Sequence, residues 1–390
     1  MLNSLALILI LGLVLGFIFT RLRLPALLGM ILTGVVLGPY GADLLDQSLL
    51  NISVELRQIA LVIILMRAGL ALNVGELKRV GRPAMLICFV PACFEIVGMM
   101  LIAPSLLGVT LLEAAILGTV VAAVSPAVIV PKMLNLMEQK IGTQRSIPQM
   151  IMAGASVDDV FVIVLFTAAT TLAVGGEFSA ASFTQIPISI VTGLVLGGGV
   201  GYLLVRFFKR FHMRDSIKLL ILISAAFSFI GLESWTKGVV PISGLLAVMA
   251  MGVAVLRWYE TLARRISPKF NKLWVGAEIL LFVLVGATVD IQYATSSTGL
   301  IAVAVILLAL LFRMAGVYVS TIKTELTLGE RLFCMIAYLP KATVQAAIGS
   351  LPLAMGLPCG KIVLTVAVVA ILITAPLGAF GIDATYKKLL

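Results

Sequence analysis

Two adjacent acidic residues, Asp158 and Asp159, lie near the middle of a long apolar stretch that runs from residue 147 to residue 175. A charged side chain at the centre of a bilayer costs about 2.5–3.5 kcal/mol even on the lenient insertion scale, so two in a row indicate a function and not a gain in stability. Adjacent helical residues point about 100° apart. We therefore expect different roles, one acid binding a cation or a proton and the other orienting it or pairing with a base.

Other charged residues are also embedded in apolar stretches. With the two aspartates they make seven, namely Arg67, Glu95, Asp158, Asp159, Glu278, Arg313 and Lys341. Left unpaired in a membrane they would together cost roughly 20 kcal/mol, which exceeds the net stability of a whole domain. They must therefore pair, change protonation or face water, and each is a candidate functional residue.

The composition indicates a polytopic membrane protein. The 390 residues are 61% hydrophobic and 12% charged, against about 25% charged in an average soluble domain. The net charge of +10 could point to nucleic acid, but no basic face is interleaved with aromatic residues, so no nucleic-acid partner is expected. The single histidine and the four cysteines have no metal-ligand spacing. The sequence predicts no cofactor and no enzymatic activity.

Thirteen apolar segments are near the ~20 residues that span a bilayer. Their approximate limits are 2–20, 25–41, 56–75, 83–104, 110–133, 147–174, 183–207, 216–235, 239–257, 273–292, 298–322, 331–356 and 361–382. The polar connections between them are too short to fold alone. We expect an all-α membrane protein of about 13 transmembrane helices, surrounded by lipid.

The distribution of Lys and Arg predicts the orientation. With the N-terminus outside, the cytoplasmic ends and loops hold 22 of the 28 basic residues and the outer ones hold three. Such an excess on the cytoplasmic side is the positive-inside rule. We expect a multi-pass protein of the cell (plasma) membrane, with its C-terminus in the cytoplasm and its first helix retained.

Two apolar segments are interrupted by proline in a similar way. The fifth contains Ser125 and Pro126, and the twelfth contains Pro340 and Lys341. Proline removes a backbone donor and clashes with the preceding turn, so each helix should break or kink near mid-depth. If two six-helix units are joined by the seventh helix, the two breaks occupy equivalent positions in opposite orientations. That is an inverted repeat, in which paired broken helices mark the transport site.

The same correspondence relates Glu95 on the fourth helix to Arg313 on the eleventh. We infer that they form an ion pair near the crossing of the broken helices. An Arg313–Asp158 pair is the competing arrangement. Lys341, which follows the second break, would offset the carbonyl ends of the interrupted helices. The sequence does not decide between these pairings.

With these residues in view, the chain resembles the two-aspartate cation/proton antiporters of the sodium/proton antiporter superfamily, and within them the NHA-type exchangers and their bacterial relatives. The resemblance covers essentially the whole chain. It rests on five blocks in the family's order and spacing: Val90–Glu95, Ala123–Pro131, Ser156–Asp159, Phe312–Arg313 and Leu339–Ala346.

This resemblance implies an NhaA-like antiporter fold, with two inverted six-helix repeats and crossed, broken helices. It also implies a homodimer and different roles in transport for different parts of the chain. The implied parts are an ion-translocating core (83–174 and 298–382), a dimerisation domain (1–75 and 216–292) and a linker helix (183–207).

The resemblance further implies the roles of the site residues. Asp159 binds the Na⁺, with Asp158 as its partner, and Arg313 is the intramembrane base. Hydroxyl or backbone oxygens come from Ser125, Val124 and Ser156, while Glu95 and Lys341 complete the electrostatics of the site. The family's usual base on the eleventh helix is lysine. Because arginine keeps its charge under essentially all conditions, it cannot act as a second proton carrier, and we expect fewer protons per cycle.

The expected activity is exchange of Na⁺ (or Li⁺) for H⁺ by alternating access in an elevator-like motion. A K⁺/H⁺ antiporter differs only in the ion. A sodium-coupled symporter could share the crossed-helix architecture but not the paired aspartates. An intramembrane aspartyl protease needs its two acids on different helices, and the sequence lacks its Gly-x-Gly-Asp motif. A channel would need a continuous polar lining, which the segments do not provide.

Overall fold

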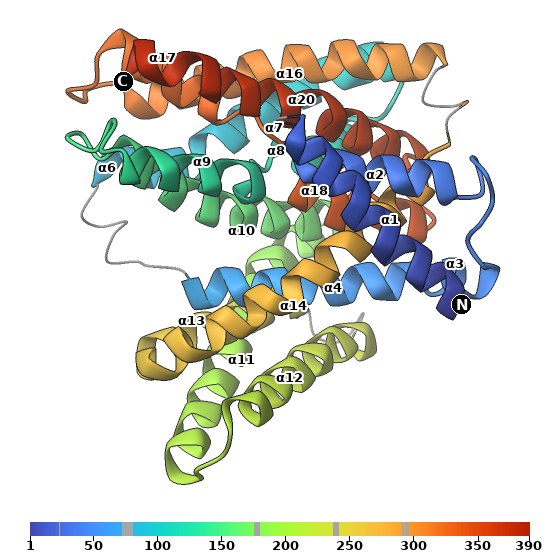
Figure 1. The fold of residues 1–390 in the computed structure, drawn as a ribbon, viewed down its shortest axis with the longest axis vertical. Helices are drawn as coiled ribbons and strands as arrows, with labels where there is room; N and C mark the ends of the chain where they lie inside the picture. The colour runs from blue at the N-terminus through green and yellow to red at the C-terminus, as the bar shows by residue number, and fades with distance from the viewer. Residues whose placement is uncertain (23, 72–80, 175–179, 237–241, 291, 293–295) are drawn as a thin grey trace. The chain divides into compact units, whose positions relative to one another are not determined.

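The computed structural model describes residues 1–390 except residues 23, 72–80, 175–179, 237–241, 291 and 293–295 (Figure 1). The side chains of some further helical residues, including Ser156 and Val160, also lie outside the described part. Within the described residues every regular element is a helix. The helices are α1 (Leu2–Arg21), α2 (Ala26–Leu37), α3 (Gln47–Asn51), α4 (Ser53–Ala71), α6 (Arg82–Ile87), α7 (Val90–Leu107), α8 (Leu111–Ala122), α9 (Pro126–Glu138), α10 (Ile147–Val174), α11 (Ala180–Arg210), α12 (Asp215–Trp235), α13 (Gly244–Trp258), α14 (Glu260–Ala287), α16 (Ser297–Thr321), α17 (Leu328–Ala337), α18 (Thr343–Ile348), α19 (Leu351–Ala354) and α20 (Gly360–Leu389).

In the described part of the chain, each of the thirteen predicted apolar segments overlaps one helix or consecutive helices, while residues 72–75, 239–241 and 291 of these segments lie outside the described residues. The fourth segment is formed by α6 and α7, the fifth by α8 and α9, and the twelfth by α17, α18 and α19. Among the described residues, nine helices are long and apolar enough to cross a membrane, counting helices joined end to end as one, and three shorter apolar helices accompany them. The expected all-α polytopic architecture is therefore confirmed.

One boundary differs from the prediction. The polar stretch at residues 258–271, expected to connect two spans, is mostly helical, because α13 ends at Trp258 and α14 begins at Glu260. Glu260 accepts a hydrogen bond from Arg264 one turn later over 2.6 Å, and such i,i+4 pairs support a helix that leaves the apolar region. Apolar periodicity alone could not detect this extension.

The two predicted helix breaks are present. The α8 helix ends at Ala122, and α9 starts at Pro126, where the missing N–H of proline is tolerated in the first turn. The second break runs from the end of α17 to the start of α18 and contains Pro340. The two breaks meet, since the Ser125 N–H donates to the Pro340 carbonyl over 2.8 Å. Pro131, by contrast, lies inside α9 without ending it.

The α7 and α16 helices pack closely through a reciprocal pair of glycines. A Cβ atom on Gly98 would lie 2.5 Å from Cγ of Phe312, and one on Gly316 would lie 3.1 Å from Cβ of Phe94. Each phenylalanine precedes a charged residue, so the two helices carry the same pattern, Phe-charged-x-x-Gly. The close approach brings Glu95 of α7 opposite Arg313 of α16.

By packing, the chain divides into two compact units. The first comprises Met1–Val54, Asn73–Ala173 and Leu281–Leu390, and the second comprises Glu55–Leu72 and Val174–Leu280. Every residue of the predicted ion site belongs to the first unit. The division into core, dimerisation and linker parts concerns their roles in transport and stays a prediction.

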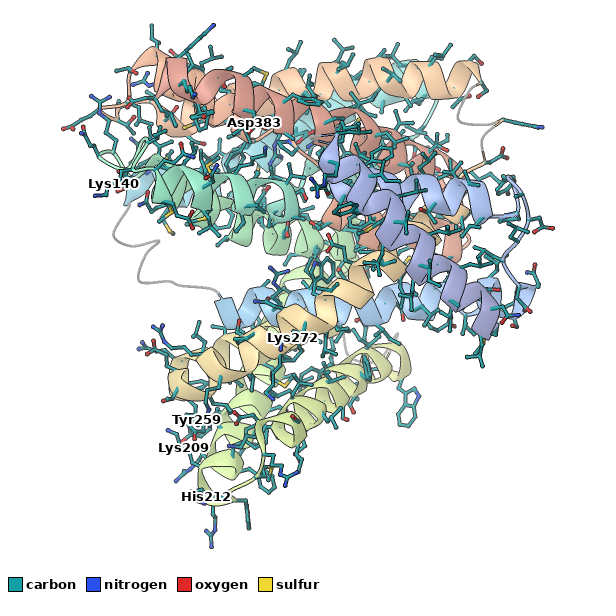
Figure 2. The ribbon with its side chains drawn as sticks, viewed as in Figure 1. Lys140, Lys209, His212, Tyr259, Lys272 and Asp383 are labelled. Carbon is teal, nitrogen blue, oxygen red and sulfur yellow. The ribbon has the colours of Figure 1, made fainter. Side chains whose placement is uncertain are left out.

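In the second unit, basic residues gather where α11 and α13 end. The ammonium groups of Lys209 and Lys218 lie 5.3 and 5.6 Å from the ring centre of Tyr259, and Figure 2 shows Lys209, His212 and Tyr259 at this end of the helices. Aromatic rings attract cations at such distances. This grouping agrees with basic residues collected at one membrane surface, while the side on which that surface lies stays a prediction.

Candidate ion-binding site

The two adjacent aspartates of α10 have different surroundings. Asp158 is 0% exposed and Asp159 is 7% exposed. Oδ2 of Asp158 accepts hydrogen bonds from the Val124 N–H at 2.9 Å and from Nη2 of Arg313 at 2.8 Å. Asp159 has no ion pair in the described part of the chain, and its Oδ1 is buried without a hydrogen-bond partner there. The surroundings of the two acids therefore differ, while the difference in their roles stays a prediction.

Arg313 joins both candidate acids, so the two pairings that the sequence left open occur together. Its Nη1 donates to Oε2 of Glu95 over 2.8 Å, and its Nη2 donates to Oδ2 of Asp158 over the same distance. Glu95 also pairs with Lys341, whose Nζ lies 2.7 Å from Oε1. All four side chains are fully buried. We call Glu95, Asp158, Arg313 and Lys341 the ion-pair cluster; in their ionised forms their charges cancel.

The guanidinium of Arg313 also caps both interrupted helices. Its Nε donates to the carbonyl of Tyr338, which caps the end of α17, over 2.7 Å. Its Nη1 also donates to the carbonyl of Ala122, the last residue of α8. Helix C-termini carry unsatisfied carbonyls and partial negative charge, which a buried cation stabilises.

The ammonium of Lys341 pairs with Glu95, and that its charge offsets the carbonyl ends of the interrupted helices stays a prediction. The remaining carbonyls at the end of α8 are satisfied by Gln345 of α18. Its Nε2 donates to the carbonyls of Val120 at 3.1 Å, Val121 at 3.1 Å and Ala123 at 2.9 Å. Arg313 and Gln345 together therefore provide donors for the carbonyls of residues 120–123.

Several buried oxygen atoms around the breaks have no hydrogen-bond partner among the described residues. They are Oγ of Ser125, Oδ1 of Asp158, Oδ1 of Asp159, Oγ1 of Thr343 and Oε1 of Gln345. A buried polar atom without a partner costs about 1–3 kcal/mol, so several such oxygens in one region are typical of a binding site. Hard cations bind such carboxylate, hydroxyl and carbonyl oxygens. Of the other expected ligands, Val124 contributes its N–H to Asp158, and the side chain of Ser156 lies outside the described residues.

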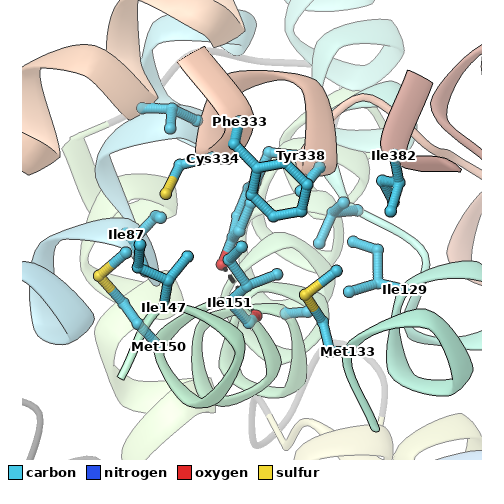
Figure 3. Packing of buried hydrophobic residues seen from close by; sticks show 14 of the residues in the cluster. Ile87, Ile129, Met133, Ile147, Met150, Ile151, Phe333, Cys334, Tyr338 and Ile382 are labelled. Atoms are coloured by element: carbon cyan, nitrogen blue, oxygen red, sulfur yellow. Dashed lines mark hydrogen bonds between the residues drawn. The ribbon is translucent and has the colours of Figure 1, made fainter. Parts of the chain in front are cut away.

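An apolar cluster lies beside the ion-pair cluster. It is built from buried side chains of α6, α9, α10, α17 and α20 that pack around Tyr338 (Figure 3). The Tyr338 hydroxyl donates to the Ile151 carbonyl over 3.4 Å, and the Arg313 guanidinium lies 5.5 Å from the Tyr338 ring centre. A Cβ atom on Gly154 would lie 2.0 Å from that hydroxyl. Glycine at residue 154 thus lets the tyrosine fill the space against α10, and the cluster excludes water from this side of Arg313.

The identity of the chain follows from comparison with known proteins. Residues 5–388 match the family model described as sodium/hydrogen exchanger, transmembrane. The chain belongs to the sodium/hydrogen exchanger family. The exchanger is 33% identical over 386 residues to sodium/hydrogen exchanger 9B2 of Mus musculus, covering 94% of this chain and 69% of the relative. It is 32% identical over 380 residues to sodium/hydrogen exchanger 9B1 of Homo sapiens, covering 94% of this chain and 73% of that relative.

The fold of the exchanger resembles that of a solved antiporter. The sodium proton antiporter MjNhaP1 from Methanocaldococcus jannaschii superimposes with a TM-score of 0.84 at 19% sequence identity, covering 100% of this chain and 98% of that one. The antiporter fold expected from the sequence is thereby confirmed. So is the expectation of a membrane transporter and not an enzyme. Membership of the two-aspartate NHA type stays a prediction.

Sequence reasoning missed two features of the exchanger's site. Gln345 received no role, although it lies in the block after the second break, where a polar side chain in an apolar helix is itself a signal. The repeated Phe-charged-x-x-Gly pattern at residues 94–98 and 312–316 was also overlooked. That repetition marks the two helices as equivalent and predicts their close contact.

Proposed function

We propose that Asp159 is the group at which Na⁺ and H⁺ compete in this Na⁺/H⁺ exchanger. The observation that carries the proposal is the charge balance of the site. The two acids and two bases of the ion-pair cluster neutralise one another, and Asp159 is left as one further buried carboxylate. A buried charge without a counter-charge is strongly unfavourable, so the site requires one monovalent positive charge.

A proton and a sodium ion each satisfy that requirement, but one carboxylate cannot hold both. Na⁺ needs several oxygen ligands, and the partnerless oxygens of Ser125 and the two aspartates are of the required kind. Asp159 is the more exposed of the two acids, which supports access for ions from its side. Val124 and Ser156 complete the proposed ligand set through backbone or hydroxyl oxygens.

Coupling follows from the cost of moving an empty site. With neither ion bound, Asp159 is an uncompensated charge that would have to cross an apolar barrier, whereas the loaded forms are neutral. Only loaded forms would then cross readily, and the two ions would be exchanged across the membrane. We propose that this happens by alternating access, with the core (83–174 and 298–382) moving against a dimerisation domain (1–75 and 216–292) in a homodimer, joined by the linker helix (183–207).

We also propose the membrane in which the exchanger lies, its orientation there and the cations that it transports. Positive-inside counting supports an outer N-terminus and a cytoplasmic C-terminus in the cell (plasma) membrane. The paired aspartates support the NHA type. We propose Li⁺ as a second substrate because it prefers the same hard oxygen ligands. K⁺/H⁺ exchange is the alternative, and it would use the same carboxylate.

The test is exchange in proteoliposomes that contain a pH-sensitive dye, with Na⁺, Li⁺ or K⁺ added outside. The wild-type protein should move protons against Na⁺, and Asp159→Asn should abolish the coupled flux because the amide carries no charge for the two ions to share. Asp383→Asn is the matched control, since this carboxylate lies on α20 outside the site and pairs with Lys132. Full activity of Asp159→Asn would refute the assignment. Proton movement in the same direction as Na⁺ would indicate a symporter.

A further inference from the structure

We propose that Gln345 is a positioning residue that sets the Na⁺ affinity of the site by holding the broken end of α8. The inference rests on the function proposed above for the aspartates. Gln345 itself was assigned no part in that function. Its carboxamide joins the second break of the fold to the first.

The contacts of Gln345 fix its orientation. Three carbonyls, those of Val120, Val121 and Ala123, surround Nε2 at 2.9–3.1 Å. Carbonyls only accept hydrogen bonds, so the NH₂ end of the amide must face them, and its two hydrogens serve three acceptors. The side chain is 1% exposed. Bulk water therefore does not reach the amide in the folded protein.

The end of α8 in turn positions Asp158. The chain leaves the helix at Ala123, and the next N–H, that of Val124, donates to Oδ2 of Asp158 over 2.9 Å. The following residue, Ser125, donates its N–H to the carbonyl of Pro340, which lies five residues before Gln345 in the chain. The amide of Gln345 therefore completes a ring of hydrogen bonds between the two breaks. Through this ring, the residues after the second break position the backbone N–H groups of Val124 and Ser125 in the first.

The oxygen of the same amide strengthens the inference. Because Nε2 is held by α8, the carboxamide cannot rotate, and Oε1 is fixed in a buried position without a hydrogen-bond partner among the described residues. A buried acceptor of this kind is unfavourable when nothing contacts it. The fixed position of this oxygen beside the break fits a site whose oxygens are oriented before the ion binds, as preorganised sites require.

The experiment uses Gln345→Met, which keeps the length of the side chain and removes both donors. Na⁺-driven exchange is measured in proteoliposomes over a range of Na⁺ concentrations. The half-saturating Na⁺ concentration should rise about tenfold, equivalent to about 1.4 kcal/mol, while the maximal rate changes much less. The thermal stabilisation of the purified protein by Na⁺ should shrink in parallel. The matched control is Gln149→Met in the first turns of α10, where another glutamine oxygen is buried without a partner; its half-saturating concentration should equal that of the wild type.

Gln345→Glu provides a second readout that does not depend on the first variant folding. An ionised carboxylate cannot donate to the three carbonyls, whereas a protonated one can donate once. The ratio of half-saturating Na⁺ concentration in this variant to that in the wild type should therefore fall as the pH is lowered. Wild-type half-saturation in both variants, or a lower rate with unchanged half-saturation, would overturn the proposal. These results are separable from the assignment of Asp159, which is tested by whether Asp159→Asn still couples the two fluxes.

Discussion

Arg313 donates to Asp158 over 2.8 Å, while Asp159, the next residue, has no ion pair among the described residues. Two acids that are adjacent in the sequence thus differ in their partners, because one guanidinium pairs with Asp158 and not with Asp159. Asp158 belongs to a neutral group of buried charges, and Asp159 carries the charge that remains.

The ion-pair cluster should behave as a coupled unit. Replacing either Glu95 or Lys341 by a neutral residue (Glu95→Gln, Lys341→Met) leaves the other charge buried without that partner, and each single variant should lose about 3–5 kcal/mol of unfolding free energy. The double variant should lose clearly less than the sum. Chemical or thermal unfolding of the purified protein measures all three. The exposed Lys132–Asp383 pair is the control, with single and double losses of about 1 kcal/mol or less. Additive losses at Glu95 and Lys341 would contradict direct coupling.

Arg313 should not be replaceable by lysine. The guanidinium donates to four acceptors: Glu95, Asp158 and the carbonyls of Ala122 and Tyr338. A guanidinium has five N–H donors in a planar arrangement, whereas an ammonium has three. Arg313→Lys leaves at least one buried acceptor unsatisfied, so we expect a loss of about 1–3 kcal/mol in stability together with impaired exchange. The exposed Arg264→Lys, paired with Glu260, should change stability by about 0.5 kcal/mol or less. A fully active and stable Arg313→Lys variant would show that the four contacts are dispensable.

Protons should compete with Na⁺ in the pH dependence of transport. When one carboxylate binds either ion, protonation removes the Na⁺ site, so the half-saturating Na⁺ concentration should rise as the pH falls. In the range where Asp159 is mostly protonated, the rise approaches about tenfold per pH unit. Sodium titrations of exchange at a series of equal inside and outside pH values measure this slope. A pH effect confined to the maximal rate, with constant half-saturation, would mean that the two ions do not share a site.

The exchange should be electroneutral. Arginine keeps its charge, Lys341 pairs with Glu95, and of the described acids of the proposed site only Asp159 lacks an ion pair, so we expect one proton per sodium ion. An imposed membrane potential, set with K⁺ and valinomycin in proteoliposomes, should then leave the rate and the equilibrium of exchange unchanged. A rate or end point that follows the potential would require a second proton carrier, and Lys341 would be the first residue to substitute.

Several features could be predicted from the sequence because their causes are local. Proline removes a backbone donor wherever it occurs, so Pro126 and Pro340 predicted the two breaks without knowledge of their neighbours in space. The length and polarity of the apolar segments likewise predicted the helices, and the cost of charge in a bilayer made Asp158 and Asp159 candidate functional residues. Boundaries with polar flanks, such as the start of α14 at Glu260, were less well predicted because the helix begins in polar residues, ahead of the apolar segment predicted from residue 273.

The partners within the site were decided only by the tertiary structure. Whether Arg313 pairs with Glu95 or Asp158 depends on the rotation and spacing of three helices, and the glycine contacts between α7 and α16 allow it to reach both. Gln345 could not be given a role before the carbonyls of residues 120–123 were brought beside it. The sequence determined which charges must be compensated inside the membrane. Long-range packing determined that four of them compensate one another and that Asp159 has no ion pair among the described residues, which is why we propose it for the transported ion.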